Sequence, residues 1–122
     1  VFMHHPPFIT GMGAMDEPFE GADLLRDVLS RAPWARLCCG HMHRPIFTAW
    51  AQGLALTVPS ISMQIDLDLS PQGGDTFRME MPGYMLHHWD GSHLNSHVCQ
   101  IPADVDFSGP HPFADSVNPV ED

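Results

Sequence analysis

Four histidines in two short clusters are the residues of this sequence best suited to chemistry. His4 and His5 lie in "VFMHHPPF", and His41 and His43 lie in "CGHMHRP". Imidazole is a common neutral ligand for zinc, iron and manganese-type ions. Both clusters therefore predict metal ligands. The alternatives are a buried histidine bonded to the backbone in the first cluster and two surface histidines in the second.

Neighbouring residues favour a fixed geometry at both clusters. Pro6 and Pro7 fix the backbone after the first cluster and keep the preceding residues extended. Gly40 precedes the second cluster and permits a tight turn. Two residues that alternate at the end of a strand, as His41 and His43 do, can point their imidazoles into one pocket. The pattern is typical of two rigid loops that present ligands at set angles.

A strand–helix–strand connection is predicted between the two clusters. Residues 1–3 are expected to end a buried strand, residues 22–31 to form a helix, and residues 35–39 to form a short strand. Adjacent parallel strands place their carboxyl ends at one sheet edge, so both histidine loops are expected side by side. The helix has one apolar face, made by Leu24, Leu25, Val28 and Leu29.

The chain after Pro45 is predicted to be mostly β. Several segments alternate apolar and polar residues with period two, which is typical of strands. Asp90-Gly91-Ser92 predicts the turn of a hairpin between "YMLHHW" and "HLNSHVCQI". Residues 102–122 are rich in Pro and Asp and are expected to be disordered or bound to a partner. Other strands are predicted in "IFTAWAQ", "LALTV", "SMQIDLDLS" and "TFRMEM".

Composition excludes some classes of partner. The formal net charge is −10 over 122 residues, and all five basic residues are arginine. Such a surface repels nucleic acid and anionic membranes. Cys38, Cys39 and Cys99 form no Cys-x-x-Cys pair, which favours free thiols in a reducing, cytoplasmic compartment. No apolar run approaches the roughly 20 residues that a membrane helix needs.

The two motifs together resemble a known family. "FMHHPPFITGMGAMD" and "CCGHMHRP" are similar to calcineurin-like metallophosphoesterases, within them most to bacterial class III cyclic-nucleotide phosphodiesterases and glycerophosphodiesterases. The predicted hairpin also resembles that subfamily's last strands, so the similarity covers roughly residues 1–101. It implies an α/β fold in which residues 1–101 form the C-terminal part of a four-layer βαβ sandwich.

The resemblance also implies a role for each motif residue. His4 and His41 would bind one metal of a two-metal centre, and His43 would bind the other. The metals would be Fe, Mn or Zn, and a hydroxide that they generate would attack a small phosphodiester. His5 and Arg44 are candidate pocket residues, and no residue is assigned as catalytic. The last strands often build a cap or a dimer contact, so a homo-oligomer is expected.

Two departures from the family pattern limit what this chain can do. The motifs that carry the family's acidic ligands are absent, and "GDTFR" at 74–78 imitates one of them only in part. Three imidazoles cannot organise two divalent metals, so the chain alone is expected to be inactive without an N-terminal half. Residue 1 also falls within a predicted strand, and further strands expected to complete its sheet are not in the sequence. Met63 stands where relatives often carry a histidine, which weakens the case for a cyclic nucleotide.

Three functions follow from these patterns. The favoured one is the histidine-ligand part of a metal-dependent phosphodiesterase. The second is a non-catalytic remnant that serves as an oligomerisation or binding module with one metal or none. The third, a small structural zinc domain, is disfavoured because three histidines lack a nearby fourth ligand. The remaining histidines are expected to be ordinary strand, surface or tail residues: His87, His88, His93, His97 and His111.

Overall fold

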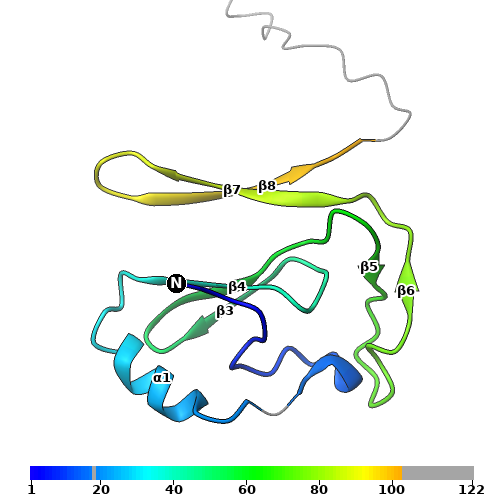
Figure 1. The fold of residues 1–122 in the computed structure, drawn as a ribbon, viewed down its shortest axis with the longest axis horizontal. Coiled ribbons are helices and arrows are strands. Elements are labelled where there is room, and N and C mark those ends of the chain that lie inside the picture. Colours follow the sequence, from blue (N-terminus) through cyan, green and yellow to red (C-terminus); the bar gives the residue numbers. More distant parts are fainter. Residues whose placement is uncertain (18, 103–122) are drawn as a thin grey trace, which may run out of the picture.

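A four-stranded mixed sheet forms the centre of the molecule. The computed structural model describes residues 1–17 and 19–102 (Figure 1). The strand order is β1-β2-β4-β3. The first three of these strands are parallel, and β3 runs antiparallel to β4. Their bounds are Phe2–Met3 for β1, Arg36–Cys39 for β2, Ile46–Trp50 for β3 and Gly53–Thr57 for β4.

The parallel pairing of β1 with β2 confirms the predicted arrangement of the two histidine loops. Phe2 lies opposite Cys38, and Met3 lies opposite Cys39. The connection between the two strands contains a short 3-10 turn at Gly13–Met15 and the helix α1 at Ala22–Leu29. Both strands therefore end at the same sheet edge, where the histidines follow.

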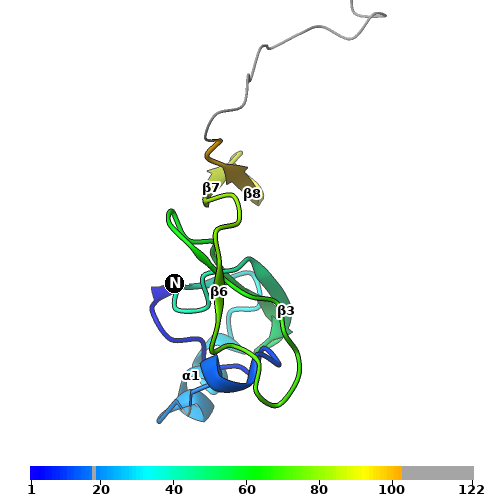
Figure 2. The ribbon, with the colours of Figure 1, turned by 90° about the vertical axis from the view of Figure 1, so that its right-hand side faces the viewer.

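Helix α1 ends two residues earlier than predicted, and its apolar face is only partly covered. Leu29 packs against a core cluster of Phe8, Leu37, Cys39 and Ala55. Leu24 and Val28, which were predicted to share the buried face, are 73% and 60% exposed. Helix α1 and the hairpin described below lie on opposite sides of the sheet (Figures 1 and 2). The sheet thus forms a middle layer within the described residues.

A second core cluster lies beneath the second histidine loop. Met42, between His41 and His43, is fully buried and packs with Met12 and Ile65. The burial of one apolar side chain between two polar ones fixes the course of this loop. The loop is therefore part of the packed structure and is not a surface appendage.

Two predicted strands are much shorter than expected. Only Gln64–Ile65 (β5) and Phe77–Arg78 (β6) pair, although the alternating pattern predicted strands across 62–70 and 76–81. The chain turns sharply after β5, where the Asp68 amide donates to the Asp66 carbonyl at 3.0 Å. Alternation produces a long strand only when one face is buried, and Leu67, Leu69 and Met79 are exposed here.

The predicted C-terminal hairpin is confirmed. Strands β7 (Gly83–Trp89) and β8 (Leu94–Gln100) pair antiparallel along their whole length. The Asp90 carboxylate accepts bonds from the amides of Ser92 and His93 at 2.8 and 2.7 Å and closes the turn. The described part of the chain is therefore mixed α/β with mostly strands, as predicted. The four-layer sandwich and the division at residue 101 stay predictions, and residues 103–122 of the expected tail lie outside the described residues.

No helix in the described ranges is long and apolar enough to cross a membrane.

His87 joins the hairpin to the central sheet. Its Nδ1 lies 2.7 Å from the Ser96 hydroxyl, and its Nε2 lies 3.8 Å from the Cys38 sulfur. Its ring also meets Phe2 edge-on, with the ring centroids 5.8 Å apart. Burial and then the Arg36 guanidinium lower the pKa of His87 below its ordinary 6.5. The fold therefore favours the neutral imidazole.

This environment predicts that acid weakens the fold through His87. The pKa of His87 is lower in the folded state than in the unfolded state. The contribution of the neutral imidazole to the free energy of unfolding is therefore complete above about pH 6.5, and it is lost as the pH falls through the folded pKa. The urea midpoint of the chain should therefore fall between pH 7.5 and pH 5.5, and His87→Gln should reduce that fall. His88→Gln changes the exposed neighbour and should leave the fall intact. An equal effect of both variants would contradict the prediction.

Candidate metal centre

The ends of β1 and β2 bring the two histidine clusters together. His4 follows β1 directly, and His41 is separated from β2 by Gly40 alone. The Gly40 amide donates to the carbonyls of Met3 and His4, at 3.2 and 2.9 Å. The two chain segments thus stay paired beyond the sheet, and they deliver their imidazoles to one place.

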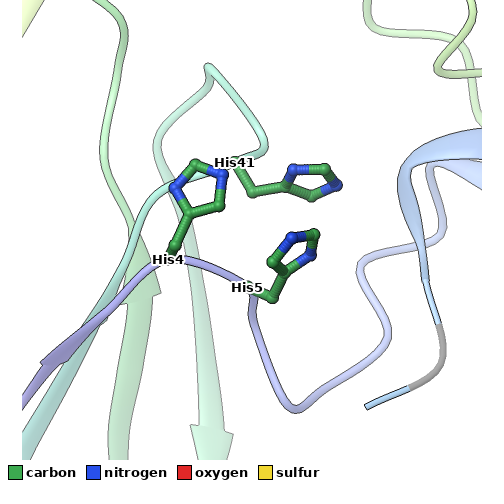
Figure 3. Close-up of side chains that lie close together, drawn as sticks. All are labelled: His4, His5 and His41. Carbon is green, nitrogen blue, oxygen red and sulfur yellow. The ribbon is translucent and has the colours of Figure 1, made fainter.

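Three imidazoles lie close enough to share an ion. One ring nitrogen from each of His4, His5 and His41 lies within 4.8 Å of the others. The ring centroids of His5 and His41 are 4.2 Å apart. The ring centroid of His4 lies 4.9 Å from that of His5 and 5.4 Å from that of His41. Figure 3 shows the three side chains converging from the two loops. Within the part of the chain that is described, this is the only group of three or more His, Cys, Asp or Glu side chains so arranged.

Gly40 leaves room for the His4 ring. A Cβ atom at position 40 would lie 3.1 Å from His4 Nδ1, which is closer than ordinary van der Waals contact. The sequence predicted that this glycine permits a turn. The structure shows that it also permits the close approach of a ligand candidate. The following histidines, His41 and His43, have positive φ values of 67° and 47°.

His43 borders the same hollow as His4 and His41. A hollow of about 270 Å³ is lined by His4, His41 and His43 together with Gly40, Val58, Pro59, Ser60 and Ile61. The Nδ1 of His43 donates to the Met63 carbonyl at 3.2 Å. This bond fixes the tautomer and leaves the Nε2 lone pair for an ion. All three predicted ligands therefore border one hollow, and the predicted pocket residue His5 lies beside them.

His41 has the properties of a ligand without an ion. Its Nε2 is buried and has no hydrogen-bond partner. Burial and then the neighbouring His5 lower the pKa of His41, and the Glu17 carboxylate opposes this effect. The imidazole is thus neutral near pH 7, with a lone pair available. A buried, unpartnered nitrogen beside two further imidazoles fits a divalent metal.

Glu17 is a site residue that the sequence analysis missed. Its Oε2 lies 3.2 Å from His5 Nδ1, and its Oε1 lies 4.0 Å from His41 Nε2. It comes from the long loop before α1, one residue beyond the first motif. No spacing signal marks a single carboxylate in such a loop, so only the folded chain could reveal it.

Arg44 braces the second histidine loop. Its guanidinium donates twice to the Ile65 carbonyl, at 2.9 and 2.7 Å, and reaches both carboxylate oxygens of Glu80 at 3.0 Å. The Thr57 hydroxyl donates to the Arg44 carbonyl at 2.5 Å. Arg44 is not among the residues that line the hollow. A contact between Arg44 and substrate therefore stays a prediction, whereas its bracing contacts are in place.

The hydrogen bonds of Arg44 predict that its replacement destabilises the fold more than replacement of Arg78. Hydrogen bonds to a charged group contribute about 1.5–3 kcal/mol when they are partly buried. Arg44→Gln should therefore lower the free energy of unfolding by about 2 kcal/mol. Arg78→Gln removes a more exposed pair with Asp66 and should lower the free energy of unfolding much less. Urea unfolding of both variants measures the difference, and equal losses would contradict the bracing role.

Comparison with curated proteins identifies the lineage of this site. A probable glycerophosphodiester phosphodiesterase of Arcobacter nitrofigilis is 37% identical over 117 residues, which cover 93% of this chain and 42% of the relative. The match lies in the C-terminal part of the relative. The chain is therefore similar to the C-terminal part of a phosphodiesterase and is consistent with a fragment of a metallophosphoesterase. The resemblance predicted from the two histidine motifs is confirmed.

Two further relatives agree with this assignment. A probable cyclic nucleotide phosphodiesterase of Rhodopseudomonas palustris is 30% identical over 83% of this chain and 38% of its own length. A glycerophosphodiester phosphodiesterase of Enterobacter lignolyticus is 31% identical over 75% of this chain and 33% of its own length. The chain thus spans about two fifths or less of these relatives. No family model matches it. The names of all three relatives describe hydrolases, so the predicted enzyme family is confirmed.

Proposed function

We propose that this chain supplies the histidine ligands of a two-metal centre that hydrolyses small phosphodiesters. The observation that carries the proposal is the meeting of His4, His41 and His43 at one hollow, from two adjacent strand ends. The names of the relatives support glycerophosphodiesters or cyclic nucleotides as the substrate class.

The residues of this chain fit a site for Fe, Mn or Zn. His4 and His41 would hold one ion and His43 the other, and Gly40 and Met63 would keep the first and last of these imidazoles in place. Bound metals polarise phosphoryl oxygens and lower the pKa of a coordinated water. The hollow beside the three imidazoles would receive the phosphodiester group. Carboxylate ligands would have to come from a further segment of the protein, and without them the chain would be inactive.

Two other features belong to the proposal. The exposed apolar side chains of the hairpin, among them Leu86, Trp89 and Val98, support a homo-oligomer. The three cysteines are free, which suits a reducing compartment such as the cytoplasm.

The alternative, a non-catalytic binding module, would retain one metal or none. Metal content therefore separates the two functions.

The test compares this chain with the full-length protein encoded by its gene. Elemental emission gives the metal content of both, and hydrolysis of glycerophosphocholine and of 3′,5′-cyclic AMP gives their activity. We expect about two metals and turnover in the full-length protein, and at most one metal and no turnover in the chain alone. A full-length protein that holds one metal or none and hydrolyses neither diester would overturn the proposal in favour of the binding module.

A further inference from the structure

We propose that Glu17 is a positioning residue that holds the imidazoles of His5 and His41 in the arrangement that accepts a cation. This inference rests on the proposed function because it concerns the same site. It adds an acidic group to a chain whose motifs contribute only histidines there. The carboxylate spans both rings, with one oxygen toward each.

Glu17 lies closer to His5 than to His41, and this difference indicates its role. Its Oε2 is 3.2 Å from His5 Nδ1, which is contact distance, whereas its Oε1 is 4.0 Å from the buried His41 Nε2. A carboxylate next to an imidazole fixes the ring orientation and the tautomer. His5 in turn lies against His41, with their rings tilted by 35°. Glu17 thus orients His41 largely through His5.

The backbone that carries Glu17 is firmly held. The preceding residue, Asp16, accepts bonds from the Thr10 amide, the Thr10 hydroxyl and the Gly11 amide, at 2.8 to 2.9 Å. Within the same turn, the Met15 amide donates to the carbonyl of the buried Met12 at 2.8 Å. A carboxylate on such a support keeps its position when the neighbouring rings are displaced.

The negative charge of Glu17 also favours a bound cation. A divalent cation among neutral imidazoles retains its full charge, and a nearby carboxylate compensates part of it. Glu17 is about half exposed, so solvent screens this effect in part. The outer partners of metal ligands typically change metal affinity by about 10–100-fold. That range is the effect expected of Glu17.

The experiment measures zinc affinity of the full-length protein by competition with a chromogenic chelator. Glu17→Gln should weaken zinc binding by about 10–100-fold. Glu20→Gln removes an equal charge from an exposed position in the same loop and should change the affinity less than about twofold. Circular dichroism checks that both variants fold.

A double-mutant cycle with His5→Phe tests the route of the effect. If Glu17 acts through His5, Glu17→Gln should have little further effect once His5 is replaced. Full additivity, or an unchanged affinity of Glu17→Gln, would overturn the positioning role. Absence of zinc binding by the unmodified protein would overturn both this role and the proposed metal centre. Normal binding with an unaffected Glu17→Gln variant would overturn this role alone.

Discussion

Replacement of His41 by alanine in the full-length protein should abolish phosphodiester hydrolysis while leaving the protein folded. His41 offers a buried, unpartnered nitrogen within the imidazole cluster. Loss of a ligated metal removes several kcal/mol of charge stabilisation in the transition state. A loss of about 4 kcal/mol corresponds to a decrease in kcat of about three orders of magnitude. The measurement is kcat for a glycerophosphodiester, together with metal content.

His97→Ala is the matched control for this prediction. His97 lies on the exposed face of β8, away from the imidazole cluster. Its variant should retain kcat within about twofold, since a surface substitution rarely disturbs the fold. If the His41→Ala variant kept its metal and an activity within a few-fold of the unmodified protein, the ligand assignment would be wrong.

Replacement of Met42 by alanine should cause the largest loss of stability in this part of the fold. Met42 is fully buried between the two histidines and packs with Met12 and Ile65. Truncation of a buried methionine costs about 2–5 kcal/mol, because contacts are lost and a cavity remains. That is a large share of the roughly 5–15 kcal/mol that stabilises a typical domain. The measurement is the free energy of unfolding in urea.

Met79→Ala provides the same chemical change at a site that is 80% exposed. It should alter the free energy of unfolding by less than about 0.5 kcal/mol. Met42→Ala should also weaken metal binding, because the loop that carries His41 and His43 loses its anchor. Equal stability of the two variants would show that Met42 does not anchor the loop.

The sequence predicted those parts of the molecule that depend on local signals. The histidine motifs, the helix that begins at Ala22 and the turn at Asp90 each have a signature a few residues long. The pairing of β1 with β2 followed from the predicted strand–helix–strand connection, which is typical of adjacent parallel strands. For this reason the sequence alone predicts that His4, His41 and His43 lie close together.

The parts that were missed depend on contacts far apart in the chain. Arg44 is 36 residues from Glu80, and no pattern links the two. Glu17 lies in an irregular loop whose course is set by tertiary packing. The segments after Ile65 and Arg78 alternate apolar and polar residues as strands do. This pattern does not show whether another part of the fold covers the apolar face.

The left-handed backbone at His41 and His43 puts thermal stability and chemistry in competition. Residues with a side chain are disfavoured in this region by about 1 kcal/mol or more, whereas glycine adopts it readily. Selection for heat resistance alone should therefore enrich glycine at both positions. The selected proteins would melt later and would have lost two of the three histidines that border the hollow.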